Sequence, residues 1–161
     1  MTVNSKNHNA NTATNTATAN TTPNMVHMER LSTAMKPHVQ HLLRSRFADV
    51  YGEAIDAAVA GADLRHSVVL RTAEGRCGGC ILVCPPTLPS REIYEQRAAK
   101  TCLPPLEIAF VATDPAFEGR GWGRRMLSEV LLSCQTTQQG CWLHVDLDNV
   151  RAHGLLSLIH I

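Results

Sequence analysis

The feature that most constrains the fold is a glycine-rich turn that joins a predicted strand to a predicted helix. Residues 106–113 read LEIAFVAT, which is typical of a buried strand. Residues 121–135 place apolar side chains at helical spacing and predict an amphipathic helix. Residues 141–147, CWLHVDL, predict another strand. A strand, a helix and a second strand in this order indicate parallel pairing with a right-handed crossover.

The residues before this unit predict the rest of an α/β fold. Their predicted elements are a strand at 25–31, a helical region at 32–61, and a hairpin with strands at 67–71 and 78–84. The helical region consists of two stretches and ends at Gly61. A long connection at 85–105 contains a short predicted helix that Ser90 can cap. Together these elements predict a mixed, mostly antiparallel sheet with helices on both faces.

The turn itself has the composition of an anion-binding site. Gly119, Gly121 and Gly123 allow tight turning and close approach of a ligand to the backbone. The start of the helix adds unpaired N–H groups and the positive end of the helix dipole, while Arg120 and Arg124 add positive charge. The Walker sequence and the G-x-G-x-x-G dinucleotide fingerprint are both excluded, because neither spacing is present.

The turn sequence EGRGWG, from Glu118 to Gly123, follows the run DPAF. Together they resemble motif A of the GNAT superfamily of acetyl-CoA-dependent N-acetyltransferases. The resemblance extends over residues 25–155 and is specific from Leu106 to Ala152. It implies a GNAT-like fold whose parallel strands splay to admit acetyl-CoA. It also implies an acyltransferase that moves the acetyl group to a primary amine by direct attack and uses no metal.

The resemblance also assigns the contacts with acetyl-CoA. In the family, the main chain at the end of the strand pairs with pantetheine, and N–H groups of the turn hold the pyrophosphate. The segment LDNVRAHG places an asparagine near the pantetheine. The cofactor-binding residues so implied are Val111, Ala112, Thr113, Glu118, Gly119, Arg120, Gly121, Trp122, Gly123, Arg124 and Asn149. Glu118 departs from the family's Arg or Gln, and a carboxylate there repels pyrophosphate by roughly 1 kcal/mol at 4 Å in water.

The reaction needs a general base, because an amine with a pKa near 10.4 is mostly protonated at pH 7. Glu107 lies in an E-I-x-F run that resembles the histone-acetyltransferase branch, where this glutamate is the base. His144 lies in WLHV, which resembles the Leu-His-Val of the protein N-terminal acetyltransferase branch. The sequence leaves open whether Glu107, His144 or both together through water act as the base.

Both base candidates resemble protein-acetylating branches, so the expected acceptor is a protein lysine or a protein N-terminal amine. A small-molecule amine is the alternative acceptor, and we expect the 85–105 connection to form the wall on the acceptor side. A catalytically inactive acyl-CoA-binding module is an alternative of another class. It is suggested by Glu118 and by Leu156, which stands where the family commonly has the tyrosine that protonates the leaving thiolate.

The two ends of the chain differ in character from residues 25–155, the expected acetyltransferase domain. Residues 1–24 form an Asn/Thr/Ala-rich tract and are expected to be a disordered tail. Residues 156–161, LSLIHI, replace the helix and last two strands of the family, so we expect a C-terminally truncated domain with an atypical tail, a candidate gene-model artefact.

Composition excludes several other classes. The formal net charge is +1, so no basic surplus supports nucleic-acid binding. No apolar run reaches the roughly 18 residues of a membrane span, and no apolar segment near the start resembles a secretory signal. The expected location is therefore the cytoplasm, the nucleus or both.

Cysteine and histidine spacing gives weak metal signals. Cys77, Cys80 and Cys84 lack the fourth ligand that structural zinc usually needs, and the C-x-x-C pair does not begin a helix, where a redox motif would place it. His38 and His41 share a predicted helix face without a third ligand. We therefore expect free thiols, a surface histidine pair and no metal.

Overall fold

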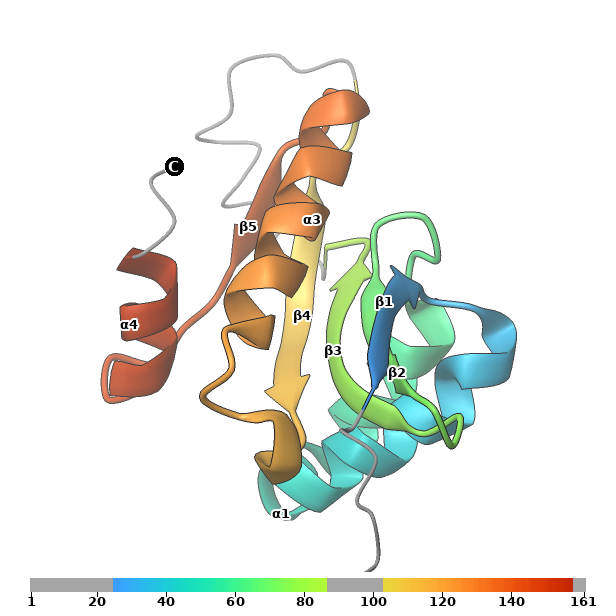
Figure 1. Cartoon of the computed structure of the whole chain (residues 1–161). Helices are drawn as coiled ribbons and strands as arrows, with labels where there is room; N and C mark the ends of the chain where they lie inside the picture. Colours follow the sequence, from blue (N-terminus) through green and yellow to red (C-terminus); the bar gives the residue numbers. More distant parts are fainter. Residues whose placement is uncertain (1–24, 87–102, 158–161) are drawn as a thin grey trace, which may run out of the picture.

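The computed structural model describes residues 25–86 and 103–157 (Figure 1). Within these residues five strands form one sheet, in the order β1-β2-β3-β4-β5. The strands are β1 (Val26–Arg30), β2 (Val68–Thr72), β3 (Cys77–Cys84), β4 (Leu106–Thr113) and β5 (Cys141–Leu143). The first four pair antiparallel, whereas β4 and β5 pair parallel. The predicted mixed, mostly antiparallel sheet is confirmed.

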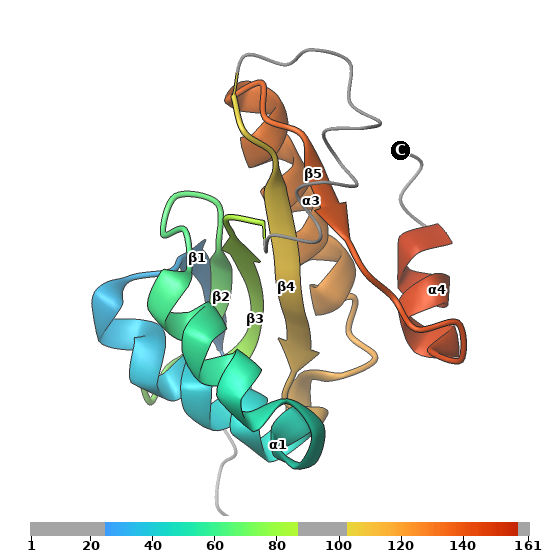
Figure 2. The same ribbon diagram turned by 180° about the vertical axis from the view of Figure 1, so that it is seen from behind.

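Helices cover both faces of this sheet, as predicted (Figures 1 and 2). The helical elements are η1 (Thr33–Met35), α1 (Lys36–Gly61), η2 (Pro115–Phe117), α3 (Trp122–Thr136) and α4 (Val150–Ser157). One expectation is wrong, because the last strand ends at Leu143 instead of Leu147. The helix α4 includes Leu156 and Ser157, the first two residues of the expected tail, and the truncation stays a prediction.

The long helix α1 bends back on itself. Tyr51 has non-helical angles of φ −126° and ψ 24°, which divide α1 into two segments. Lys36 Nζ donates to the carbonyl oxygen of Ala60 at 2.8 Å, and Arg44 pairs with Asp56 at 2.6 Å, so the segments lie side by side. The two predicted helical stretches are therefore confirmed, and together they form a helical hairpin.

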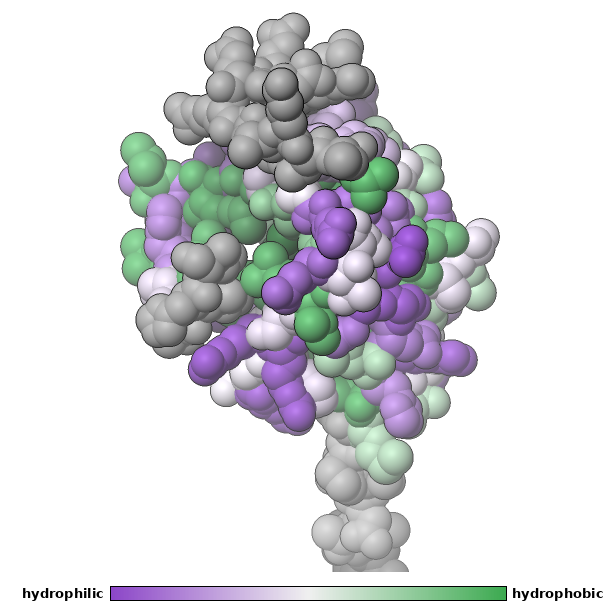
Figure 3. Space-filling model, turned by 90° about the horizontal axis from the view of Figure 1, so that it is seen from above, coloured by the Kyte–Doolittle hydropathy of each residue, from purple (hydrophilic) through white to green (hydrophobic). Residues whose placement is uncertain are grey.

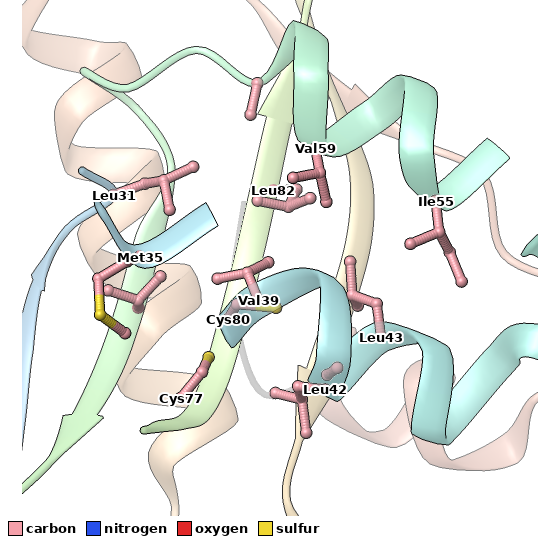
Figure 4. Packing of buried hydrophobic residues seen from close by; sticks show 13 residues of the cluster. Leu31, Met35, Val39, Leu42, Leu43, Ile55, Val59, Cys77, Cys80 and Leu82 are labelled. Carbon is pink, nitrogen blue, oxygen red and sulfur yellow. The ribbon is translucent and has the colours of Figure 1, made fainter. Parts of the chain in front are cut away.

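Two apolar layers hold the helices to the sheet. The layer between α1 and the sheet is shown in Figure 4 and contains Leu31, Met35, Val39, Leu42, Leu43, Ile55, Val59, Ala62, Val69, Cys77, Cys80, Leu82 and Ala112. The layer beneath α3 contains Val68, Leu70, Ile81, Val83, Leu106, Ile108, Met126, Leu127, Val130 and Cys134. Neighbouring strand residues alternate between the two layers, as the period of a β-strand requires.

This alternation is interrupted once in β4. Val83 pairs with Ile108 and Leu82 pairs with Phe110, so Ala109 has no partner in β3 and forms a β-bulge. Ile108 packs in the α3 layer, and Phe110, two residues later, packs against the α1 layer. Because of the bulge, Phe110 and the residues after it face the side opposite to the one that uninterrupted alternation would give them. Bulges of this kind commonly lie beside functional sites.

Some expectations concern residues outside the described ranges. These are the tail at 1–24, the short helix expected within the 85–105 connection, and the last residues, 158–161. Of the helices in residues 25–86 and 103–157, none combines the length and apolar character needed to cross a membrane.

Candidate active site

A cleft of about 1110 Å³ opens where β4 and β5 separate. The parallel ladder joins only Leu106–Ile108 to Cys141–Leu143. Beyond Ile108 the two strands diverge, with β5 leading toward α4 (Figures 1 and 2). Seen from above, hydrophobic residues gather in a hollowed region on the side of the molecule that carries β5 and α4 (Figure 3). The cleft is slightly larger than the ~300–1,000 Å³ of common small-molecule sites.

The structure brings the predicted site residues together around this cleft. Those that line it are Glu107, Val111, Ala112, Thr113, Glu118, Gly119, Gly121, Trp122, Gly123, Arg124, His144 and Asn149. Arg120 is the one predicted residue outside the lining, and its guanidinium lies over the Phe117 ring, 5.8 Å from the centroid. Residues of α1 and α3 both contribute, so the cleft reaches both sides of the sheet at the point where it opens.

The glycine-rich turn has the backbone geometry of an anion cradle. Gly119 and Gly121 have φ of +72° and +76°, a left-handed conformation that favours glycine. Gly121 precedes α3, and its carbonyl accepts from Arg125 N at 3.1 Å, so the N–H groups of Trp122, Gly123 and Arg124 precede the first α-helical hydrogen bond. A Cβ at Gly119 or Gly121 would meet open space. The turn therefore fits a phosphate group.

Glu118, whose carboxylate was expected to repel the pyrophosphate, is paired with two arginines. Its Oε1 accepts from Arg46 of α1 at 2.8 Å, and its Oε2 accepts from Arg151 of α4 at 2.7 Å. The hydrogen bond and charge of Arg151, followed by the charge of Arg46, lower the pKa of the Glu118 carboxyl. Sequence reasoning missed both arginines, because they lie 72 and 33 residues from Glu118 in the chain.

Glu107 lies on the α1 side of the sheet, close to where β4 and β5 part. It pairs with Cys84 of β3 and with Trp142 of β5. The Cys84 thiol donates to the carbonyl oxygen of Ala58 in α1 at 3.4 Å, so Cys84 and its partner Glu107 lie on the face of the sheet that α1 covers. Burial, and then the negative charge of Glu107, raises the pKa of the Cys84 thiol to about 11.

His144 follows the end of β5, where the sequence predicted it within the strand. Its ring lies 5.1 Å from that of Trp142, centroid to centroid. Because Trp142 is the parallel partner of Glu107, their side chains leave the sheet on the same face. The two candidate bases thus line one cleft, and Trp142 neighbours both of them.

The contact between Glu107 and Cys84 predicts a measurable change in thiol reactivity. With a pKa of about 11, only on the order of one Cys84 thiol in a thousand is ionised at pH 8. Removing the nearby negative charge in Glu107→Gln lowers this pKa, so alkylation of Cys84 should become about two- to threefold faster. Peptide mass spectrometry after timed iodoacetamide treatment measures this rate. Glu53→Gln, on the exposed side of α1, is the matched control, and equal rates in both variants would contradict the contact.

Helix α4 forms the wall of the cleft opposite α1. Asn149 begins it, since its Oδ1 accepts from the N–H of Ala152 at 3.0 Å. Leu155 lies 3.6 Å from the position of a Cβ on Gly123, which brings α4 against the start of α3. Leu156, where the family commonly has tyrosine, also lines the cleft. The aliphatic side chain offers no proton to a leaving group.

An aromatic cluster at the bend of α1 was missed by sequence reasoning. The Phe47 and Tyr51 ring centroids are 6.5 Å apart, and they lie 5.9 and 6.1 Å from that of Phe110. All three residues line the cleft. The chain has only seven Phe, Trp and Tyr residues. Their number does not tell where they lie in the fold, so composition gave no signal that three of them would meet at the cleft.

The cysteine and histidine patterns build no metal centre in the described residues. Cys77 and Cys80 are buried in the α1 layer, and Cys84 faces the same side. His38 and His41 are exposed on α1. Across residues 25–86 and 103–157, no three His, Cys, Asp or Glu side chains form a group that could hold a metal ion.

Comparisons with known proteins agree with this geometry. The Acetyltransferase (GNAT) family model matches residues 37–158. Arabidopsis thaliana NAA60, solved with acetyl-CoA, has a TM-score of 0.65 at 16% identity over 83% of this chain and 84% of that one. The ribosomal-protein-S18-alanine N-acetyltransferase of Escherichia coli has a TM-score of 0.59 at 18% identity, over 83% and 76%.

An aminoglycoside antibiotic 6'-N-acetyltransferase of Acinetobacter baumannii has a TM-score of 0.57 at 12% identity, over 85% of this chain and 92% of that one. No curated protein matches the chain. At these identities the solved structures show a shared fold, and the family model spans most of the 161 residues, including the turn and the cleft. The chain therefore belongs to the Acetyltransferase (GNAT) family.

Proposed function

We propose that this acetyltransferase moves an acetyl group from acetyl-CoA to a primary amine of a protein by direct attack of the amine. The observation that carries the proposal is the cleft where the sheet opens between β4 and β5. An anion cradle lies at one end of this cleft, at the start of α3, and a carboxylate lies on the α1 side. The structure of Arabidopsis NAA60 with acetyl-CoA supports the cosubstrate.

The residues that would hold acetyl-CoA are those of the turn and the free edge of β4. N–H groups from Glu118 to Arg124 would face the pyrophosphate, and the main chain of Val111–Thr113, beyond the parallel ladder with β5, would face the pantetheine. Asn149 would lie beside the pantetheine at the start of α4. Acetyl-CoA supplies the acetyl thioester.

Glu107 and His144 are the proposed proton acceptors for the amine. A protonated amine has no lone pair with which to attack, so a base on the acceptor side must remove a proton directly or through water. Glu107, on the α1 face, is the first candidate. His144, near Glu107 through Trp142, can take the same role or relay the proton through water.

The aromatic cluster in the cleft favours a protein acceptor over an aminoglycoside. Phe47, Tyr51 and Phe110 line the cleft and offer an apolar surface that a peptide side chain can cover, whereas a polycationic sugar has little apolar surface to place there. The E. coli relative named for a protein alanine supports this class, and we infer a cytoplasmic or nuclear acceptor.

A donor and acceptor screen tests the proposal. Acetyl-CoA binding to the full chain is measured by calorimetry, and CoA release is then followed with peptides bearing a free N-terminus, acetylated peptides bearing lysine, and aminoglycosides. We expect near-equimolar binding and turnover with one peptide class. Turnover with aminoglycosides alone would contradict the protein acceptor, and binding without any turnover would identify the inactive acyl-CoA-binding module.

A further inference from the structure

We propose that Arg46 and Arg151 bind the phosphate groups of acetyl-CoA, and that Glu118 holds their guanidinium groups beside the turn. The inference rests on the proposed cosubstrate and adds two residues that come from outside the glycine-rich motif. Its basis is the convergence of α1, α4 and the turn on one carboxylate.

The geometry brings two cations to the mouth of the anion cradle. Glu118 directly precedes Gly119, the first left-handed residue of the turn, so its partners lie beside the turn. Arg46 approaches from α1 and Arg151 from α4, at 2.8 and 2.7 Å from the two carboxylate oxygens. Both arginines line the cleft. Arg46 from α1 and Arg151 from α4 therefore add positive charge to the same cleft that the glycine-rich turn lines.

The charges favour a bound anion. Two guanidinium groups and one carboxylate leave one net positive charge, to which the positive end of the α3 dipole adds. Each arginine reaches Glu118 through Nη2, and a guanidinium carries five N–H donors, so one carboxylate oxygen does not saturate either side chain. Guanidinium donors match phosphate oxygens in a bidentate arrangement.

Exposure indicates which atoms a ligand can reach. The side chain of Arg46 is 31% exposed and that of Arg151 is 78% exposed, whereas Glu118 is 27% exposed. Both arginines therefore keep solvent-accessible surface while they pair with Glu118, and Arg151 is far more exposed than the carboxylate. Their positive charges offset the repulsion expected from a carboxylate at position 118.

The experiment compares two ligands that differ in their phosphates. Acetyl-CoA carries the phosphates, and S-acetylpantetheine carries the same thioester arm without them. Each is titrated into the full-length protein and followed by tryptophan fluorescence, since Trp122 lies in the cleft. We expect Arg46→Ala and Arg151→Ala each to weaken acetyl-CoA binding by about tenfold, as loss of a charge-assisted hydrogen bond implies. Binding of S-acetylpantetheine should stay within about twofold of the wild-type value.

The matched control is Arg44→Ala. Arg44 lies on α1 two residues before Arg46 and also pairs with a carboxylate, Asp56, yet it lies outside the cleft lining. Its removal should change the affinity for neither ligand. Arg46→Gln and Arg151→Gln, which retain length and hydrogen-bonding capacity without charge, replace the alanine variants if those fail to fold.

The outcomes separate this inference from the proposed function. Unchanged acetyl-CoA affinity in both arginine variants would overturn the phosphate contact while leaving the cosubstrate in place. An equal loss of both ligands would also overturn it, because the arginines would then act only by holding the shape of the cleft. Wild-type protein that binds neither ligand would refute the proposed cosubstrate itself, and the inference with it.

Discussion

Glu107→Gln is expected to lower kcat/KM for acetyl transfer by roughly 10²- to 10⁴-fold, the usual contribution of a general base. Glutamine keeps the size of the side chain beside Cys84 and Trp142 but cannot accept the proton. Acetyl-CoA affinity should stay within about threefold of the wild-type value, because Glu107 lies on the α1 face, away from the glycine-rich turn.

The pH profile separates a lost base from a damaged site. As pH rises toward the amine pKa near 10.4, the acceptor loses its proton without help, so the deficit of Glu107→Gln should shrink. We would measure kcat/KM with one acceptor across this range. Glu53→Gln, which changes an exposed carboxylate of α1 outside the cleft, should match the wild type throughout. A deficit that is constant with pH would indicate a structural role for Glu107.

His144→Ala tests the second candidate base, and its effect on kcat/KM is compared with that of Glu107→Gln. If the two groups act together through water, either substitution should lower kcat/KM strongly, and the double variant should lose little more than the worse single variant. If Glu107 acts alone, His144→Ala should have a small effect. If neither substitution lowers kcat/KM by about tenfold, which is below the usual range for a general base, both assignments are wrong.

Gly121→Ala is expected to weaken acetyl-CoA binding by roughly 100-fold, because loss of two charge-assisted hydrogen bonds has about this effect. Gly121 has φ +76° at the start of α3, and alanine resists this conformation by about 1–2 kcal/mol. The added methyl group would meet no protein atom within 4 Å, so a loss of affinity would come from the changed turn geometry or from contact with the ligand and not from a clash within the protein. Calorimetry measures the affinity, and thermal unfolding measures the change in stability.

Gly52→Ala is the control for this substitution. Gly52 lies in α1, a Cβ there also meets open space, and its φ is not in the left-handed region. Alanine should leave acetyl-CoA binding unchanged and the free energy of unfolding nearly so, because Gly52 lies beside the bend at Tyr51 and not in the middle of a helix. Wild-type affinity in a folded Gly121→Ala protein would contradict the turn as the phosphate site.

The parts of the site that are local in sequence could be predicted from it. β4, the glycine-rich turn and α3 are consecutive, and their strand and helix periods, turn residues and order determine their geometry. The apolar residues at helical spacing in α3 all pack in the layer beneath it; these are Trp122, Met126, Leu127, Val130, Leu131 and Cys134. Glu107 at the start of β4 was singled out by the resemblance of its E-I-x-F run to the histone-acetyltransferase branch, and its role stays a prediction.

The parts that depend on distant segments could not be predicted. Arg46 meets Glu118 because α1 packs on the sheet, and Arg151 meets it because α4 packs against the start of α3. The contact of Phe47 with Phe110 also depends on the packing of α1 against the sheet. The early end of β5 has a related cause: a strand continues only while it has a pairing partner, and the parallel ladder with β4 ends at Ile108.

Because of the bulge at Ala109, the spacing of two residues in the sequence of β4 does not by itself tell whether their side chains share a face of the sheet. In a regular strand two residues share a face only when their residue numbers differ by an even number. Glu107 and Phe110 are three apart, yet both face α1, because Ala109 adds one residue without adding a pair. Deleting Ala109 would leave Glu107 and Phe110 two residues apart in a regular strand, so Phe110 to Thr113 would keep their faces and their pairing with β3. The acid and the aromatic ring therefore share the α1 face whether β4 carries this extra residue as a bulge or lacks it.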